Sequence, residues 1–215
     1  MIEERINKFK SRPLSWSSIS SFRYDKEKWY KNYILNEKEP DTEELIFGKK
    51  VADSLQTETP LVPFTLYPVV EQKLEVVFGG IPLIGFMDTY DPTTHSFREF
   101  KTGKKAWDQK RADEHGQITM YSLMLFITHK VRPETYNMHL EWVPTQQNGD
   151  FSISFVEPVK IHIFETKRTM NDLVSFGAYI RVTYDEMIDF IEEKGVANVS
   201  TRANRYCKRP CKQDY

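Results

Sequence analysis

The chain has 215 residues, of which 40% are hydrophobic and 13% aromatic, and its formal net charge is −1. This length and apolar content suffice for one sizeable globular domain and leave little room for a second. The near-zero charge excludes a protein that coats nucleic acid through its overall charge, so any such binding must come from local basic patches. No apolar run approaches the ~18 residues that a membrane span needs, so we expect a soluble, cytoplasmic protein without a membrane partner.

The N-terminal part, about residues 1–58, is predicted to be helical. Ser15 or Ser17 can cap a helix that runs to about Leu35, with aromatic side chains such as Trp16 at helical spacing. These rings could stack on nucleobases, although packing against the core is their commoner role. After a polar loop, a second helix is predicted from about Thr42 to Thr57.

Three consecutive strands are predicted next, at the start of a core that spans about residues 65–165. The segment YPVVEQKLEVVF, residues 67–78, suits a strand that leads to the Gly79-Gly80 turn. A second apolar strand runs to Tyr90. The turn residues DPTTH, residues 91–95, separate it from a third strand over 96–101.

The turn between the second and third strands fixes their register. If it centres near Thr93, residues pair across it when their numbers sum to about 187. Asp88 and Glu99 meet this condition, which predicts two carboxylates side by side, roughly 5 Å apart at Cβ. Such neighbours repel each other unless a cation lies between them.

The triplet Glu99-Phe100-Lys101 places Glu99 and Lys101 on one face of the third strand and Phe100 on the other. Two carboxylates with a lysine on one sheet face form a hard oxygen site that suits Mg²⁺, and the ammonium can position an attacking water. That is the chemistry of phosphodiester hydrolysis. The alternative is an ordinary solvent-facing hairpin, because E-x-K triplets are common.

A basic loop with Lys104 and Lys105 leads from the third strand into a helix near residues 113–128. Gln117 and Tyr121 stand four residues apart on one face of this helix, and the other faces are apolar. A glutamine on a core helix needs hydrogen-bond partners, and the charged site of the hairpin is the natural place for them. His115 could also touch a phosphate.

The last third of the chain is predicted to hold further strands over 136–143 and 151–164, and then C-terminal helices within 166–215. One helix is expected over 168–181. Thr183 with Glu186 predicts a capping box for another that ends near Gly195. The basic end of the chain could grip phosphates or form a solvated tail; its cations are Arg202, Arg205, Lys208, Arg209 and Lys212.

Together these motifs resemble the PD-(D/E)XK nuclease superfamily, in its RecB-like exonuclease branch, which includes CRISPR-associated adaptation nucleases and phage recombination exonucleases. The resemblance is carried by G-x-x-D at 85–88, E-x-K at 99–101 and Q-x-x-x-Y at 117–121. The segment LSWSSISSFRYDKEKWYKNYIL resembles the opening helix of that branch, and Phe47-Gly48 its next, glycine-started helix. The resemblance covers most of the chain.

The resemblance implies an α/β fold with a restriction-endonuclease-like core, a central mixed β-sheet flanked by helices, in one domain over 1–215. It makes Asp88, Glu99 and the Phe100 carbonyl ligands of Mg²⁺ or Mn²⁺, and Lys101 the group that orients the water. Glu71 is an additional candidate ligand. The residues implied in DNA contact or bracing are Gln117, Tyr121, Lys104 and Lys105, with Arg205, Lys208 and Arg209 as further candidates.

Two features depart from the pattern of the branch. Its usual histidine, four residues after the glycine, is Ala52 here, which leaves the number of bound ions open. Iron–sulfur members use four cysteines, whereas this chain has Cys207 and Cys211, and Asp25 stands where the first would be expected. We therefore expect no iron–sulfur cluster, and reduced thiols.

The sequence thus predicts a metal-dependent DNA nuclease. The resemblance favours an exonuclease of recombination, repair or phage replication in a bacterial or phage-infected cell, working with recombination or replication proteins. An endonuclease is the close alternative. A catalytically silent nucleic-acid-binding module with the same fold and a hydrolase of small phosphate esters also remain open, as do cleavage polarity and oligomeric state.

Overall fold

The computed structural model of the chain describes residues 2–206, with side chains up to residue 195. The chain divides into two compact units. The sheet unit comprises Leu14–Trp16 and Glu39–Gly177, and the helical unit comprises Met1–Pro13, Ser17–Lys38 and Ala178–Tyr215.

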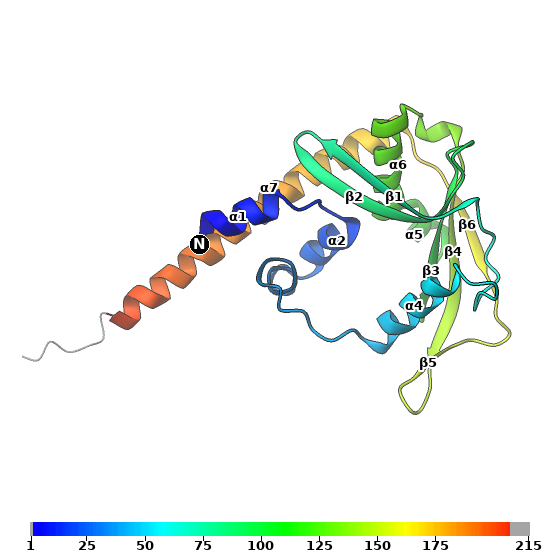
Figure 1. Cartoon of the computed structure of the whole chain (residues 1–215), viewed down its shortest axis with the longest axis horizontal. Coiled ribbons are helices and arrows are strands. Elements are labelled where there is room, and N and C mark those ends of the chain that lie inside the picture. The colour runs from blue at the N-terminus through cyan, green and yellow to red at the C-terminus, as the bar shows by residue number, and fades with distance from the viewer. Residues whose placement is uncertain (1, 207–215) are drawn as a thin grey trace, which may run out of the picture. The chain divides into compact units, whose positions relative to one another are not determined.

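The sheet unit is built on a six-stranded mixed sheet in the order β1-β2-β3-β4-β5, with β6 also paired to β4 (Figure 1). The β3–β4 pair is parallel and the other pairs are antiparallel. The expected α/β fold with a central mixed sheet flanked by helices is confirmed. The strands are β1 Val69–Phe78, β2 Ile81–Tyr90, β3 Phe97–Gly103, β4 Met138–Gln147, β5 Ile153–Phe155 and β6 His162–Thr166.

The register across the β2–β3 turn is the one expected from the sequence. Thr89 pairs with Arg98 and Tyr90 with Phe97, and both sums are 187. Asp91 closes the turn, because its carboxylate accepts from the backbone N–H of Thr93 at 2.8 Å, as turn aspartates do. Backbone pairing between β2 and β3 runs from Tyr90–Phe97 to Thr89–Arg98, and beyond it the Phe100 N–H bonds to the side chain of Asp88.

Alternation along β3 divides the core between two layers. Phe97 contacts Tyr121 of helix α6, with ring centroids 5.8 Å apart. Phe100 points to the other face, where it stacks on Phe64 at 4.1 Å beside Val51 of helix α4. Helices α4 and α6 therefore cover opposite faces of the sheet (Figure 1). The helices of this unit are α4 Glu43–Ser54, α5 Gln109–Asp113, α6 Gly116–His129 and the 3₁₀ turn Pro133–Thr135.

Helix α6 is the core helix predicted from its apolar sequence. Its residues from Ile118 to Leu125 are all buried. Helix α4 starts after Thr42, whose hydroxyl accepts from the N–H of Leu45, so this helix is also as predicted. The resemblance implied that Gly48 opens a helix. Gly48 instead lies in the middle of α4.

The helical unit differs from the sequence prediction at its first long helix. The predicted helix to Leu35 is three segments, because Asp25 interrupts it and caps a new start by accepting from the N–H of Lys28. The third segment is a π-helix. An additional helix, α1, buries Ile6 and Phe9. The segments are α1 Ile2–Lys10, α2 Trp16–Tyr24, α3 Lys26–Trp29 and η1 Tyr30–Leu35.

The two predicted C-terminal helices are a single helix, α7 Met170–Tyr206. The capping-box prediction is wrong because its two side chains have other partners. The hydroxyl of Thr183 accepts from Nη2 of Arg23 at 2.6 Å. Glu186 forms ion pairs with Arg23 at 2.9 Å and with Lys26 at 3.6 Å. Side-chain contacts with α2 and α3 therefore replace the expected cap.

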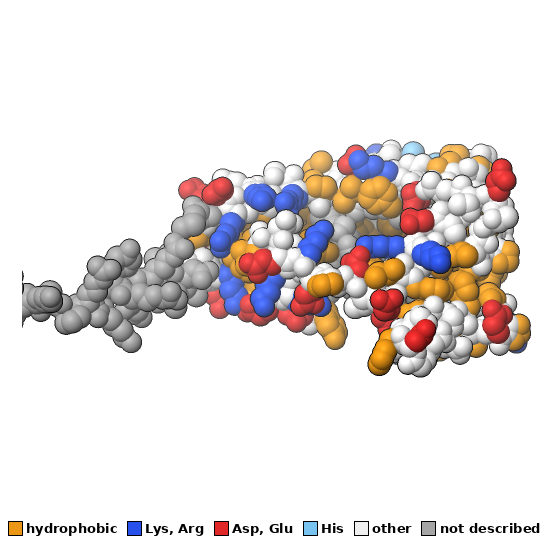
Figure 2. All heavy atoms as spheres, turned by 60° about the horizontal axis from the view of Figure 1, so that its bottom comes forward, with side chains coloured by type: hydrophobic (Ala, Val, Ile, Leu, Met, Phe, Trp, Pro, Cys, Tyr) orange, Lys and Arg blue, Asp and Glu red, His pale blue; other side chains and the backbone are white. Residues whose placement is uncertain are grey.

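No helix among residues 2–206 is both long and apolar enough to cross a membrane. The face drawn in Figure 2 carries basic and acidic side chains interspersed with apolar ones, in keeping with the nearly balanced net charge.

Candidate active site

The site expected from the sequence lies where β2 and β3 separate. The backbone N–H of Phe100 donates to Oδ2 of Asp88 at 2.6 Å. The aspartate side chain thus takes the hydrogen bond that a strand carbonyl would otherwise accept, and this fixes one carboxylate oxygen. Its neighbour Glu99 is 2% exposed. The two carboxylates are close enough for the charge of Glu99 to act on Asp88, as expected from the register of the turn.

A chain of hydrogen bonds connects Glu99 to helix α6. Nζ of Lys101 donates to Oε1 of Glu99 and, at 2.8 Å, to Oε1 of Gln117. Nε2 of Gln117 donates in turn to the hydroxyl of Tyr121 at 2.6 Å. That hydroxyl donates to the carbonyl of Phe86 on β2. The polar side chains of the motif therefore brace β3, α6 and β2 against one another.

Burial and like charge raise the pKa of the carboxylates. Burial raises the pKa of Asp88 to about 8, and the neighbouring charge of Glu99 adds to the rise. Burial also raises the pKa of Glu99, against the opposing effect of Lys101. A pair that resists losing both protons near neutral pH is stabilised in its ionised form by a divalent cation.

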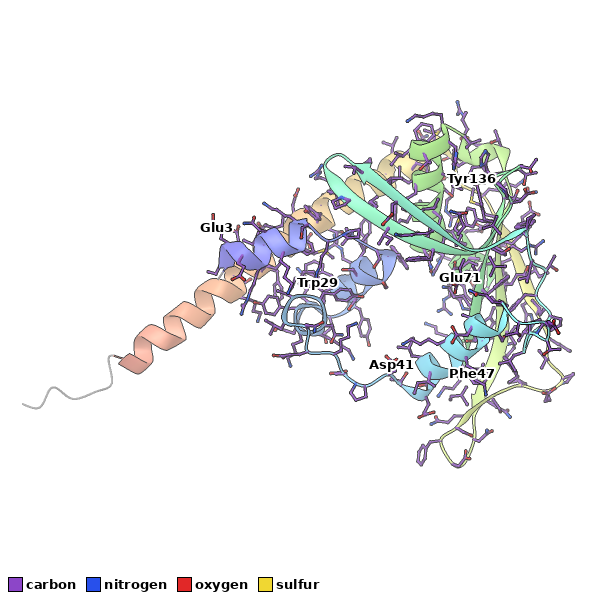
Figure 3. The ribbon with its side chains drawn as sticks, in the orientation of Figure 1. Glu3, Trp29, Asp41, Phe47, Glu71 and Tyr136 are labelled. Carbon is purple, nitrogen blue, oxygen red and sulfur yellow. The ribbon has the colours of Figure 1, made fainter. Side chains whose placement is uncertain are left out.

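A third carboxylate lies next to this pair. Glu71 of β1 stands opposite Asp88, between the pairs Val70–Thr89 and Gln72–Met87, and its charge contributes to the raised pKa of Asp88. Glu71 has a φ of 55°, in the left-handed region. Its Oε2 accepts from Nε2 of Gln56 at 2.9 Å, just beyond α4. Figure 3 marks Glu71 on the strand and Phe47 on α4.

The site opens into a cavity of about 290 Å³ between the sheet and α4. Asp88 and Lys101 line its floor, and the small side chain of Ala52 lines the opposite wall. Lys104 stands beside Glu44, another lining residue, in an ion pair of 2.7 Å. The complete lining is Glu44, Leu45, Gly48, Val51, Ala52, Leu55, Asp88, Phe100, Lys101 and Thr102.

The donor set fits a hard divalent cation. Oε2 of Glu99 is buried and has no hydrogen-bond partner, which is costly for a carboxylate oxygen unless a ligand satisfies it. Mg²⁺ is typically held by one or two carboxylates and keeps several waters. Among the described residues, no group of three or more histidine, cysteine or acidic side chains could by itself hold a metal ion. Asp88, Glu99 and the Phe100 carbonyl thus remain the candidate ligands.

The residues expected to contact DNA differ in how accessible they are. Tyr121 is 3% exposed, so its surroundings support the bracing role rather than contact with nucleic acid. Lys104 also donates to Gln147 at 3.1 Å, and Lys105 is exposed. Lys208 and Arg209 lie outside the described residues, and the side chain of Arg205 does as well.

Arg168 anchors the helices beside the site, and no sequence motif predicts this role. It is 3% exposed, and its guanidinium donates to the hydroxyls of Thr119 and Thr166 and to the carbonyls of Ala112 and His115. These bonds tie the end of α5 to the start of α6, two residues before Gln117. No local sequence pattern points to Arg168, because its partners are up to 56 positions away in the chain.

No protein-family model matches the chain, and no curated protein matches its sequence. Its structure is similar to the crystal structure of a "putative exonuclease" from Eubacterium rectale, with a TM-score of 0.58 at 11% identity over 87% of this chain and 84% of that one. The structure of SSO0001 aligns at 13% identity over 85% and 82% of the two chains, with a TM-score of only 0.43. At such identity the likeness concerns the fold: the chain shares the mixed α/β fold of the Eubacterium rectale protein.

Proposed function

We propose that the protein is a metal-dependent nuclease that hydrolyses phosphodiester bonds of DNA. The observation that carries the proposal is a pair of neighbouring carboxylates, the half-buried Asp88 and the buried Glu99, with Lys101 bonded to Glu99. Asp88 and Lys101 both line the cavity beside α4. A merely structural sheet gains nothing from two neighbouring, largely desolvated carboxylates, because their repulsion and desolvation are unfavourable. A cation-dependent reaction needs them.

Asp88, Glu99 and the Phe100 carbonyl would hold Mg²⁺ or Mn²⁺. Glu71, the further candidate from the sequence, is exposed and bonded to Gln56, and it does not complete a three-carboxylate group with them in the described residues. When bound, the ion supplies charge stabilisation at the scissile phosphate and lowers the pKa of a coordinated water. Glu99 holds the ammonium of Lys101, and Gln117 fixes it from the other side. Lys101 would orient the attacking water from this position.

The cavity beside α4 supports a polymeric substrate. It reaches the surface, because its lining includes the exposed Glu44 and Leu45, and Ala52 leaves space where a larger side chain would stand. A closed pocket would instead favour a small phosphate ester. Lys105 is exposed at the loop after β3 and would meet backbone phosphates, as Lys104 would if it leaves Glu44.

The finer assignment rests on the motif resemblance to the RecB-like branch of the PD-(D/E)XK nucleases. The fold shared with the Eubacterium rectale protein is compatible with it. Both favour an exonuclease over an endonuclease, and the resemblance alone suggests recombination, repair or phage replication as the setting. A catalytically silent DNA-binding module is the second candidate, favoured by Ala52 in place of the usual histidine.

A cleavage assay decides between these functions. End-labelled and circular DNA, single- and double-stranded, are incubated with Mg²⁺, Mn²⁺ or EDTA. We expect metal-dependent loss of linear DNA that Asp88→Asn and Lys101→Ala reduce by at least about a hundredfold. Cleavage of circles would identify an endonuclease. Activity that persists in Asp88→Asn would refute the proposed site, and binding without cleavage in every metal would favour the silent module.

A further inference from the structure

A second cavity, of about 380 Å³, lies in the sheet unit at the junction of α5 and α6. Its volume is within the range of about 300–1,000 Å³ that is usual for small-ligand sites. It is separate from the cavity beside α4, since the two share no lining residue. The lining consists of Trp16, Asp108, Lys110, Arg111, Glu114, His115 and Gly116.

Two planar rings, those of Trp16 and His115, line the cavity, and Trp107 packs behind His115. A Cβ on Gly116 would lie 2.1 Å from the Trp16 ring, so the glycine allows the indole to rest directly on the start of α6. The imidazole of His115 stands between two indoles. Its centroid is 6.1 Å from that of Trp16 and 5.0 Å from that of Trp107, both edge-on. The rings thus hold one another in place without a ligand.

The guanidinium of Arg111 adds a further planar group. It lies 3.9 Å from the centroid of the Trp107 ring. Its Nη1 donates to the carbonyls of Lys105 at 3.4 Å and Ala106 at 3.1 Å. The guanidinium is therefore held against the Trp107 ring and the loop that precedes α5. Aromatic rings and stacked arginines are the surfaces on which nucleobases of single strands stack.

The charges of the lining favour a neutral ligand over an isolated phosphate. Lys110 and Arg111 are offset by Asp108 and Glu114, so the lining has no net charge. Burial lowers the pKa of His115 to about 3, so this imidazole is neutral at physiological pH. Its buried Nδ1 has no hydrogen-bond partner. The acidic side chains can accept from exocyclic amino groups, which bases carry and phosphates do not.

The cavity is linked to Lys101 of the candidate active site through the start of α6, and the charge of Lys101 acts on the lining residue His115. Gly116 lines it, and the next residue, Gln117, accepts from Nζ of Lys101. We infer that the cavity between Trp16 and the α5–α6 junction binds a nucleobase of the strand being cut, one or a few nucleotides from the scissile phosphate. This inference rests on the proposed nuclease function and adds to it that the enzyme grips single-stranded DNA by stacking.

Abasic oligonucleotides test it directly, because they keep the phosphates and lose the base. The probe is a set of fluorescein-labelled single-stranded oligonucleotides in which one abasic nucleotide is moved along the strand. Binding is measured by anisotropy in EDTA, with Asp88→Asn to prevent cleavage. We expect one position where the abasic probe binds about tenfold more weakly than the intact one, the size of effect typical of one stacked base.

Two variants assign that preference to the cavity. The quantity compared is the ratio of the Kd of the abasic probe to that of the intact probe. Trp16→Leu and Arg111→Gln should bring this ratio close to one. Phe151→Ala, which removes a 71% exposed ring from the β4–β5 loop, should leave it unchanged. Since Trp16 also packs on Gly116, melting curves check folding, and Arg111→Gln decides if Trp16→Leu does not fold. No binding of the intact probe, a ratio near one at every position, or an unchanged ratio in Arg111→Gln overturns the inference.

The outcome is distinguishable from failure of the nuclease proposal. Metal-dependent cleavage by the unmodified protein without a base preference would leave the nuclease function standing and remove the stacking site. A base preference in a protein that cleaves nothing would establish the stacking site in a DNA-binding module.

Discussion

Asp88 accepts the backbone N–H of Phe100 at 2.6 Å, so a side chain of β2 takes over the pairing of β3 at the position where the two strands part. Loss of solvation, and then the charge of Glu99, raise the pKa of this carboxyl to about 8. Between about pH 4 and 8 the folded protein therefore binds a proton at Asp88 that the unfolded chain does not bind, although the hydrogen bond from Phe100 opposes this rise in pKa.

Without metal, this group should make the protein less stable as the pH rises. Between pH 4 and 8 the folded state keeps a proton on Asp88 that the unfolded state has lost, so the free energy of unfolding falls with pH. Each unit of pKa difference corresponds to about 1.4 kcal/mol. Asp88→Asn retains an acceptor for Phe100 and removes the titration, so in EDTA it should exceed the unmodified protein in stability by about 2 kcal/mol or more at pH 8.

Urea unfolding at pH 5 and pH 8 provides the measurement. The comparison uses the difference between the two proteins, because His115, whose pKa is lowered to about 3, adds an opposite pH dependence to both. Millimolar Mg²⁺ should stabilise the unmodified protein at pH 8 and leave Asp88→Asn unchanged. An equal response of both proteins to Mg²⁺ would exclude Asp88 as a ligand.

Gln117 is expected to matter for turnover more than for substrate binding. Its Oε1 accepts from Lys101 and its Nε2 donates to Tyr121, so Gln117→Leu frees the ammonium to move. We expect kcat to fall about tenfold or more with little change in KM, as for loss of a positioning contact. Gln109→Leu, on exposed α5, is the control. A rise in KM alone would indicate that Gln117 contacts DNA instead.

Gly85 is expected to be intolerant of a side chain. A Cβ there would lie 2.7 Å from a ring carbon of the buried Tyr121, which cannot move without breaking its bonds to Gln117 and Phe86. Gly85→Ala should therefore lower stability by about 1–3 kcal/mol and reduce activity. Gly103→Ala is a matched control, since its Cβ would meet nothing within 4 Å. Equal melting temperatures of the two variants would contradict the close packing.

Arg168 is expected to stabilise the α5–α6 junction. Replacing it by methionine leaves the carbonyls of Ala112 and His115 without these donors inside the protein. Loss of such charged hydrogen bonds should lower the free energy of unfolding by about 3 kcal/mol or more. Arg132→Met, with a side chain that is 65% exposed, should cost less than about 0.5 kcal/mol. Denaturant titration compares them, and similar losses would show that Arg168 is not a structural anchor.

Local sequence was a good guide where the determinants were local. The turn chemistry of residues 91–95 set the β2–β3 register, and with it the juxtaposition of Asp88 and Glu99. The apolar sequence of α6 identified a core helix and implied that Gln117 must find a partner. Local rules failed at Thr183, where a capping signal lies inside α7, because contacts with Arg23 outweigh an intrinsic preference.

The sequence by itself determined the β2–β3 register, the core helix and the proximity of Asp88 to Glu99, since these follow from turn type, alternation and residue chemistry. Tertiary structure alone decided that Oε2 of Glu99 lacks a partner, that Arg168 ties α5 to α6, and that Trp16 meets His115 across the chain. These features depend on residues far apart in sequence, and only packing in three dimensions brings them together.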